Sequence, residues 1–476
     1  MLSYQDLTRL GDNEVDRMAF IKKAINTHKS SPIYQQAKTA KEYYDKKNKT
    51  IMDFQKLLYT VTGDAIPDNY SANYKLRSLF FYRFITQENQ YLLANGVSWN
   101  DDATENKLGK KKYPFDNQLQ KAGIKALWGG VSFGFWNLDH LDIFDILEYV
   151  PLWDENDGAM KSGIRFWQVA NDKPLRATLY ELDGYTEYIW NEVEKDGKVE
   201  YEGKILQEKR TYLQIVISSE ADGQTIYPAT NYNGFPIVPL WANPQHQTEL
   251  EGLQEGIDCY DLIKSGFANT VDEASYIYWA IQNAGGMDDV DLANFVERMK
   301  TVHAGLVEDS NARAEAHTIE APYASREALL DRIRSDLYED AMALDTKSIQ
   351  DGAITATQIK ASYSNLDSKT DDYEYCVIDF INGVLDIAGI EDEPTFTRSR
   401  ILNVQEEVQT VVSAGTYLES SYVTEKILTI LGDGDKAEDM IKEMDANEIR
   451  PLQITDEKVQ AIDEELINGE ENNVQE

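Results

Sequence analysis

The sequence predicts an α+β fold, because its hydrophobic pattern changes twice along the chain. Residues 1 to about 135 have a mainly helical pattern, with Leu76, Phe80 and Phe84 at four-residue spacing. From Phe133 to Val238 apolar residues alternate with polar ones, as in half-buried strands. Helical spacing then returns for most of the remaining chain. We therefore expect strands in one region, with helices before and after it.

The alternating region is predicted to be a β-meander. Its strand-like runs are RFWQVA, RATLYEL, TEYIW and RTYLQIVIS, and the segments NDKP, LDG and EKDGK separate them. The Asp-Gly pairs suit tight hairpin turns, because glycine accepts positive φ angles. Successive strands are therefore expected to pair as hairpins.

Two amphipathic helices are predicted on either side of a short mixed insert. The first lies in Asn243–Asn269, after the strand-like run GFPIVPLWA, and the second lies in Ser325–Leu344. The insert contains GGMDDVDLANFVERMKT, which has the pattern of a short helix with an acidic start. The following segment, VHAGLVEDSNARAEAHTIEA, is typical of two strands around a turn.

A very long helix is predicted after the second of these helices. Thr355 suits the N-cap position, Gln358 completes a capping box, and Gly389 supplies a C-terminal stop. Apolar residues recur between these ends at spacings of three, four or seven. The helix would span about 34 residues, or roughly 50 Å. Gly383 lies inside it and is a candidate kink.

The C-terminal part is predicted to be helical after a short strand at Thr395–Arg398. The segments LNVQEEVQTVVSAG and SSYVTEKILTIL are both amphipathic at helical spacing. The polar end of the chain, EELINGEENNVQE, is expected to be disordered.

This order of elements resembles the portal proteins of long-tailed, siphovirus-type bacteriophages. The local wording that carries the resemblance is PIVPLWANPQHQTELEGLQEGIDCYDLIKSGFANTVDE and ITATQIKASYSNLDSKTDDYEYCVIDFINGVL. It extends upstream to KTAKEYYDKKN, YSANYKLRSLFFYRFITQENQYLLANGVSW and FDNQLQKAGIKALWGGVSFGFW. Together these segments cover most of residues 30 to 430.

The resemblance implies a portal-type fold with an α/β wing, a two-helix stem, a small mixed clip, a long wing helix and a helical crown. The expected boundaries are wing 1–245, first stem helix 246–272, clip 273–323, second stem helix 324–344, tunnel loop 345–354, returning wing helix and strand 355–402, crown 403–465 and disordered tail 466–476. It also implies a ring of about twelve subunits at one capsid vertex, through which double-stranded DNA enters and leaves.

The resemblance further implies the partners of such a ring. These are the terminase motor, the head-to-tail connector, and the major capsid and scaffolding proteins. The clip would dock first the terminase and later the connector. The ring itself would be non-enzymatic and would need no cofactor or metal.

The loop after the second stem helix carries most of the candidate site residues. Its sequence, DTKSIQDGAI, is small and polar, which suits a mobile segment that projects beyond a packed scaffold. Lys347, Gln350 and Asp351 are placed to touch DNA phosphates or neighbouring subunits, and Gly352 is a candidate hinge. A plain solvated turn is the alternative. The candidate DNA-channel residues are Asp345, Thr346, Lys347, Ser348, Ile349, Gln350, Asp351 and Gly352.

Three aromatic residues are candidates for partner docking in the clip. Tyr278, Trp279 and Phe295 lie in the insert between the stem helices. Aromatic side chains are enriched at interfaces, but they also pack in cores, and the sequence leaves both roles open.

The charge balance argues against a protein that grips DNA phosphates. Lys and Arg number 46 against 83 Asp and Glu, which gives a formal net charge of −37. A protein that binds by counterion release needs clustered positive charge. An acidic channel wall would instead keep a passing polyanion centred by repulsion. Solubility is an equally good explanation for the charges outside a channel.

No nucleotide-binding or metal-binding motif is apparent. GDGDKAED at 432–439 lacks the spacing of a phosphate-binding loop, and the five histidines are dispersed. The acidic clusters at 154–157 and 288–291 are expected by chance in so acidic a chain. A metal-dependent nucleic-acid hydrolase is nevertheless one alternative reading. Another virion protein, such as a connector or minor capsid protein, is the second.

The remaining features concern the compartment. Cys259 and Cys376 lie far apart on predicted helices, so we expect no disulfide framework and take both thiols as buried. The N-terminal segment has scattered charges, and the chain has no 18-residue uncharged apolar run. The expectation is a protein that is neither secreted nor membrane-spanning, assembled in the host cytoplasm and located at the portal vertex of the virion.

Overall fold

The computed structural model describes most of the chain up to residue 442. The described residues are 2–11, 13–59, 63–69, 71–101, 103–170, 172–195, 198–213, 216–219, 223–226, 230–273, 278–282, 290, 294, 313–317, 323–347, 360–399, 404–415, 417–431 and 440–442. Two compact units are present: Met1–Ser348 with Tyr363–Ser399, and Ile349–Ser362 with Arg400–Glu476.

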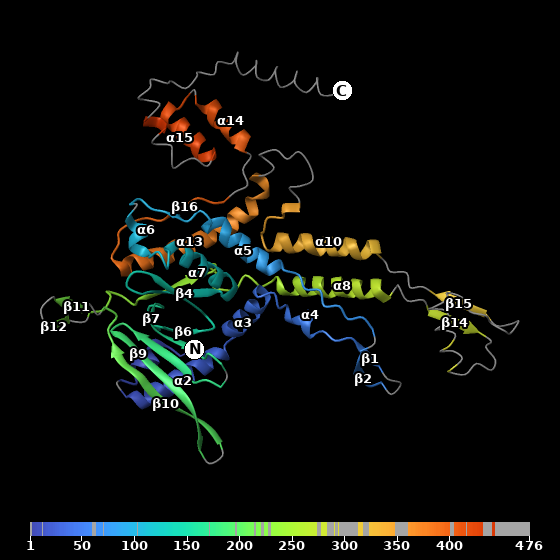
Figure 1. The fold of residues 1–476 in the computed structure, drawn as a ribbon, viewed down its shortest axis with the longest axis horizontal. Helices are drawn as coiled ribbons and strands as arrows, with labels where there is room; N and C mark the ends of the chain where they lie inside the picture. The colour runs from blue at the N-terminus through green and yellow to red at the C-terminus, as the bar shows by residue number, and fades with distance from the viewer. Residues whose placement is uncertain are drawn as a thin grey trace. The chain divides into compact units, whose positions relative to one another are not determined.

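Helices form the first part of the larger unit, as the sequence predicts (Figure 1). Polar caps begin the first three of them: Ser3 precedes α1, Asn13 precedes α2, and Ser31 precedes α3, which has Pro32 in its first turn. Of the three residues predicted at helical spacing, Phe80 and Phe84 are buried on α5, whereas Leu76 precedes that helix and is 37% exposed. The helices are α1 (Tyr4–Thr8), α2 (Glu14–Lys29), α3 (Pro32–Tyr44), α4 (Lys49–Asp53), α5 (Phe80–Leu93), α6 (Ala103–Leu108) and α7 (Phe115–Gly129).

The predicted β-meander is confirmed as a five-stranded antiparallel sheet in the order β10-β9-β8-β7-β6. The run RTYLQIVIS is not one strand, however, because the long strand β10 ends at Arg210 and β11 begins only at Val216. The strands are β6 (Tyr149–Trp153), β7 (Met160–Trp167), β8 (Leu175–Glu181), β9 (Gly184–Lys195) and β10 (Lys198–Arg210). A separate hairpin joins β11 (Val216–Ser219) to β12 (Gly223–Ile226).

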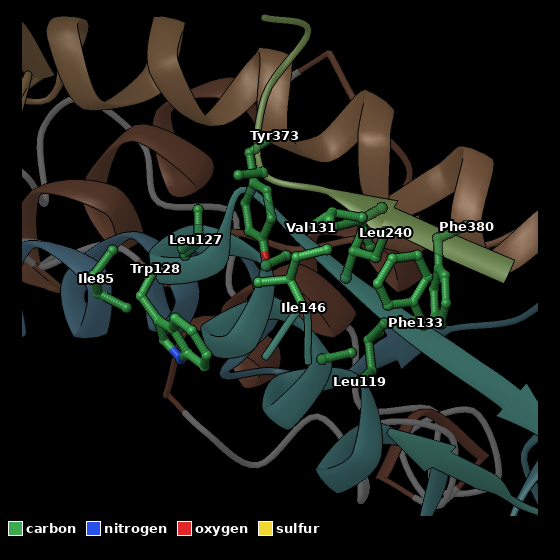
Figure 2. Close-up of a cluster of buried hydrophobic side chains, with 14 of the residues drawn as sticks. Ile85, Leu119, Leu127, Trp128, Val131, Phe133, Ile146, Leu240, Tyr373 and Phe380 are labelled. Atoms are coloured by element: carbon green, nitrogen blue, oxygen red, sulfur yellow. The ribbon is translucent and has the colours of Figure 1, made fainter. Parts of the chain in front are cut away.

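A second sheet has the order β13-β4-β5 and is covered by helices. Its strands are β4 (Val131–Trp136), β5 (Leu141–Asp145) and β13 (Ile237–Trp241). Figure 2 shows Tyr373 and Phe380 of one helix among Val131, Phe133 and Leu240 of this sheet. These side chains belong to the main hydrophobic core. A second core packs α1 and α2 against the five-stranded sheet.

The helix in Figure 2 is α13 (Ser364–Ala388), the long helix predicted from the sequence. Its predicted stop is confirmed, since Gly389 has the left-handed φ of 68°. It begins after Tyr363, and residues 360–362 immediately before it are also helical. The predicted cap residues Thr355 and Gln358 lie outside the described residues. Gly383 serves close packing: a Cβ there would lie 2.8 Å from Cγ1 of Val238 on β13.

The predicted helix pair is present as α8 (Gln254–Glu273) and α10 (Tyr323–Asp340). Beyond them lies a hairpin of β14 (Tyr278–Gln282) and β15 (Arg313–His317) (Figure 1). The sequence predicts two strands around a turn in residues 302–321, and β15 lies in the second of these, whereas the first lies outside the described residues. The described partner of β15 is β14, at the opposite end of the insert, because strand pairing depends on which segments the fold brings together.

Short strands and the smaller unit complete the described chain. The short strand predicted at Thr395–Arg398 is β16 (Thr395–Phe396), paired with β3 (Val97–Ser98). In the smaller unit, α14 (Val404–Ala414) and α15 (Ser420–Leu431) match the two predicted amphipathic segments. The polar tail after residue 442 lies outside the described residues.

Candidate functional site

The helix pair α8 and α10 forms the scaffold of the candidate site. The helices run antiparallel, since Gly256 approaches Leu337 at one end while Phe267 and Tyr323 meet at the other, with ring centroids 5.7 Å apart. A Cβ at Gly256 would lie 2.9 Å from Cδ2 of Leu337, so glycine permits the close approach there. Near the far end, the guanidinium of Arg326 donates to the hydroxyl of Thr270 over 2.8 Å.

The chain leaves α10 through a tightly held turn. The backbone N–H of Ala343 donates to the carbonyl of Tyr338, and Met342 has a left-handed φ of 52°. The Gln87 side chain on α5 then makes two hydrogen bonds with the backbone of Leu344. Its Nε2 donates to the carbonyl oxygen at 3.1 Å, and its Oε1 accepts from the backbone nitrogen at 3.0 Å. The start of the following loop is thus fixed to α5.

Asp345, the first predicted loop residue, is turned back onto α10. Its Oδ1 lies 2.5 Å from Nη2 of Arg334, and this hydrogen bond raises the pKa of the Arg334 guanidinium. The same carboxylate oxygen accepts from the backbone N–H of Lys347 at 3.0 Å. The Nζ of Lys347 is 3.8 Å from Oδ1 of Asp331. Asp345 is therefore an anchor of the loop base.

A buried ion triad lies beside this turn. Lys369 of α13 places its Nζ 2.9 Å from Oε2 of Glu88 and 2.7 Å from Oε2 of Glu249. The same ammonium donates to the carbonyl oxygen of Ala341, at the C-terminal end of α10, over 3.2 Å. Burial, together with the neighbouring Glu249 carboxylate, raises the pKa of Glu88. Lys369 therefore ties α13 to the end of α10.

The structure describes only part of the predicted loop. Asp345, Thr346 and Lys347 are described, and the last two are exposed. The other five candidates lie outside the described residues: Ser348, Ile349, Gln350, Asp351 and Gly352.

The predicted docking aromatics lie partly in the described hairpin. Tyr278 and Trp279 are in β14, where they pair with His317 and Ala316 of β15. Phe295 lies outside the described residues.

Apart from Asp345, the residues that hold the loop base were not among those singled out from the sequence. The signal for two of them is visible afterwards. Lys369 stands beside Leu366, Thr370 and Tyr373 in the buried stripe of α13. Glu88 likewise sits on the buried side of α5. A Lys and a Glu on the apolar faces of two helices indicate a buried pair. The pairing of Gln87 with Leu344 has no such signal, because it depends on backbone atoms 257 residues away.

Other polar candidates are engaged in structural contacts. Asp154 accepts from Nζ of Lys161 at 2.5 Å and from the backbone N–H of Asn156 at 2.8 Å. Within the described ranges, no group of three or more His, Cys, Asp or Glu side chains is placed to hold a metal ion. Asp288, Asp289 and Asp291 lie outside those ranges.

The two cysteine thiols are free, and His28 is a buried histidine. Both cysteines are free, as predicted, but Cys259 is exposed on α8, which corrects the expectation of burial. His28 is buried, its Nε2 lies 2.7 Å from the carbonyl oxygen of Ile146, and burial lowers the pKa of the imidazole.

None of the helices that the structure describes is long and apolar enough to cross a bilayer.

Comparison with known proteins decides the family. The family model described as "Phage portal protein, SPP1 Gp6-like" matches residues 23–450, which is most of the chain. This chain belongs to that family of phage portal proteins. The α+β portal-type fold predicted from the sequence is thereby confirmed.

Two portal relatives show how distant the sequence similarity is. The portal protein of Bacillus phage SPP1 is 22% identical over 426 residues, covering 83% of this chain and 80% of the relative. The portal protein of Clostridium phage phiCD119 is 24% identical over 185 residues, which are 37% of this chain but only 41% of the relative. A solved structure described as the neck of a native GTA particle, computed with C12 symmetry, is 10% identical with a TM-score of 0.40. The match between the two covers 73% of this portal chain and 89% of the chain in the solved structure.

Proposed function

We propose that this portal protein forms a ring of about twelve subunits at one capsid vertex, with a central channel for double-stranded DNA. DNA would enter through the channel during packaging and leave through it at infection. The membership of residues 23–450 in the phage portal family carries this proposal.

The helix pair has the charge expected of a channel wall. Together α8 and α10 carry ten acidic and four basic side chains. An acidic wall repels the phosphates of a duplex and so opposes adhesion during translocation. We infer that these two helices form the stem around the channel.

The loop that follows α10 is the proposed DNA-facing element. Its base is fixed by the Gln87–Leu344 hydrogen bonds and by the Arg334–Asp345 pair. Because the first end of the loop is fixed in this way, residues 346–352 of every subunit would start from the same position and project toward the axis. Lys347 would be the basic side chain that meets the phosphates.

The proposed portal positions DNA and partners and performs no bond chemistry itself. A terminase would supply ATP hydrolysis, and a head-to-tail connector would later occupy the same docking region. The β14–β15 hairpin, with Tyr278 and Trp279, is the proposed clip on which both dock, with Phe295 as a further contact. Major capsid and scaffolding proteins would surround the wing, placing the protein in the virion after assembly in the host cytoplasm.

Imaging and an activity assay test this function. Negative-stain images and native mass spectrometry of purified protein should show a ring of about twelve copies with a central hole. A monomer that persists at all salt and protein concentrations would refute the ring. Purified protein should not hydrolyse ATP or DNA; turnover that one point substitution in this chain abolishes would contradict a purely structural role.

A further inference from the structure

An arm of the chain, residues 46–78, lies along α8 and carries exposed apolar side chains. It includes α4, β1 (Leu57–Tyr59) and β2 (Ala65–Pro67); Figure 1 shows α4 beside α8 and the β1–β2 hairpin farther from that helix. Seven exposed large apolar residues fall in this short segment: Met52, Phe54, Leu57, Leu58, Ile66, Tyr74 and Leu76. None of the seven belongs to either of the two core clusters found among the described residues.

A ladder of polar side chains fastens the arm to α8. The backbone N–H groups of Ser78, Leu76 and Tyr74 donate to Asp261 (2.6 Å), Ser265 (2.9 Å) and Asn269 (2.7 Å). The spacing matches on both sides. Four helical residues rise about 6.0 Å and two extended residues about 6.6 Å, so every second amide meets every fourth side chain.

All three acceptors of the ladder are buried, with exposures of 0%, 3% and 3% for Asp261, Ser265 and Asn269. Additional bonds hold the beginning of the arm. Asn48 donates to Oδ2 of Asp261 at 2.5 Å, and Thr50 donates to Oδ2 of Asp258 at 2.7 Å. Buried, satisfied polar contacts of this kind define one geometry, so the arm is a fixed part of the stem.

The ladder also sets the order of layers in the stem. At about 100° per residue, Asp261 and Asn269 lie on one side of α8, whereas Gly256 and Phe267, which contact α10, lie on the opposite side. The order is therefore arm, α8, α10. One end of this stack presents the arm and the other presents the outer face of α10.

These two ends are complementary in charge. The arm contains six basic and three acidic residues in a chain of net charge −37, and Lys47, Lys49 and Arg77 on it are exposed. The outer part of α10 exposes Glu327 and Asp331 beside Ala324, Ala328 and Leu329. Arg332 is also exposed there, and its charge is paired with Asp336 on the same helix at 2.9 Å. The arm thus presents apolar residues edged by positive charge. The outer face of α10 presents small and apolar residues edged by negative charge.

We propose that the arm of one subunit packs on the outer face of α10 of a second copy of this chain. Two different surfaces of one chain then form a head-to-tail contact, the type that generates rings. The hairpin itself supports this, because an isolated two-stranded hairpin is marginally stable in water. Here Leu58 and Ile66, which are 39% and 45% exposed, are cross-strand partners on one face of it. The inference rests on the proposed ring and adds which surfaces build it.

Two separate variants and their mixture test the contact. Leu58→Asp puts an acidic group on the arm, and Ala328→Arg puts a bulky basic group on the outer face of α10. Each variant alone should need at least about tenfold more protein for half-maximal assembly than the wild type. Val169→Asp is the matched control, since Val169 is 84% exposed outside the arm and α10; it should assemble like the wild type.

The equimolar mixture gives the most specific result. An intact arm from the Ala328→Arg chain can bind the intact α10 face of the Leu58→Asp chain, while the other two surfaces are blocked. Native mass spectrometry should therefore show a mixed dimer that does not grow. Circular dichroism spectra and unfolding midpoints like those of the control establish that both variants are folded.

Several outcomes would overturn the inference. If the wild type forms rings and Leu58→Asp forms them equally well, the arm is not the contact, although the proposed ring stands. If the wild type stays monomeric, the ring itself fails. If Lys47→Glu with Lys49→Glu abolishes duplex DNA binding by assembled rings and leaves assembly unchanged, the arm is a nucleic-acid surface instead.

Discussion

Gln87 holds the backbone of Leu344 with two hydrogen bonds, of 3.1 Å and 3.0 Å, although 257 residues separate them. This contact joins α5 to the last fixed residue before the proposed DNA-facing loop. It lies beside the ion triad of Lys369, Glu88 and Glu249, which reaches the carbonyl of Ala341. The loop base is therefore held from two helices, α5 and α13, and each contact gives a prediction.

The first prediction concerns the loop itself. Deleting Ser348 to Gly352, or substituting Lys347→Glu, should impair DNA packaging or retention while rings still form. The deletion removes no part of the apolar stripes of the predicted helices, and the substitution adds like charge facing DNA in about twelve copies. An in vivo packaging assay beside ring imaging measures both effects. Lys173→Glu is the control, since Lys173 is exposed between β7 and β8. Variants that fill heads normally would show that the loop has no transport role.

The second prediction concerns the loop anchor. Gln87→Met should lower the free energy of unfolding by about 1–3 kcal/mol, because it leaves the buried Leu344 amide without its partner. Hydrogen exchange at the Leu344 amide should accelerate at the same time. Gln35→Met removes a single exposed hydrogen bond to Lys29 and is the matched control. Equal stability of the two variants in guanidinium unfolding would argue against an anchoring role.

The third prediction concerns the cation of the triad. Lys369→Met should cost about 3–5 kcal/mol, because it leaves two carboxylates in a largely buried site without a counter-charge. Lys41→Met, which removes an exposed pair with Asp45, should cost no more than about 1 kcal/mol. Guanidinium unfolding at one fixed protein concentration compares the two. A cost for Lys369→Met as small as that of the control would show that the triad does not hold the helices together.

The fourth prediction is a pH dependence that arises from Glu88. Its pKa is raised by burial and by the Glu249 carboxylate, so the folded state binds this proton more tightly than the unfolded state. Above the ordinary value of 4.5, unfolding releases the proton, and the contribution of Glu88 to stability falls as pH rises. Glu88→Gln should flatten this part of the stability curve. A curve of unchanged slope in that variant would assign the pH dependence to other groups.

The fifth prediction concerns the contact of α13 with β13. Gly383→Ala should destabilise the protein by about 1–2 kcal/mol even though alanine favours a helix, because its Cβ would lie 2.8 Å from Cγ1 of Val238. Val238→Ala in the same chain should recover part of the loss by making room. A double-mutant cycle on unfolding free energies measures the coupling. Additive effects would mean that the two residues do not meet.

The sequence by itself determined the local elements and the family. The apolar spacing in the predicted helix pair, the stop at Gly389 and the alternation of the meander are local patterns. The structure has α8, α10, α13 and the five-stranded sheet where these patterns occur. Such patterns reflect which face of one segment is buried, so they can be seen without knowing its neighbours.

Only the tertiary structure decided which distant segments meet. β15 pairs with β14 at the far end of the insert, Gln87 contacts the backbone of Leu344, and the arm lies on Asp261, Ser265 and Asn269 of α8. In each case the partner groups are backbone amides or carbonyls, which every residue carries except for the missing N–H of proline. Side-chain patterns therefore do not reveal such contacts, and the packing of the whole chain selects them.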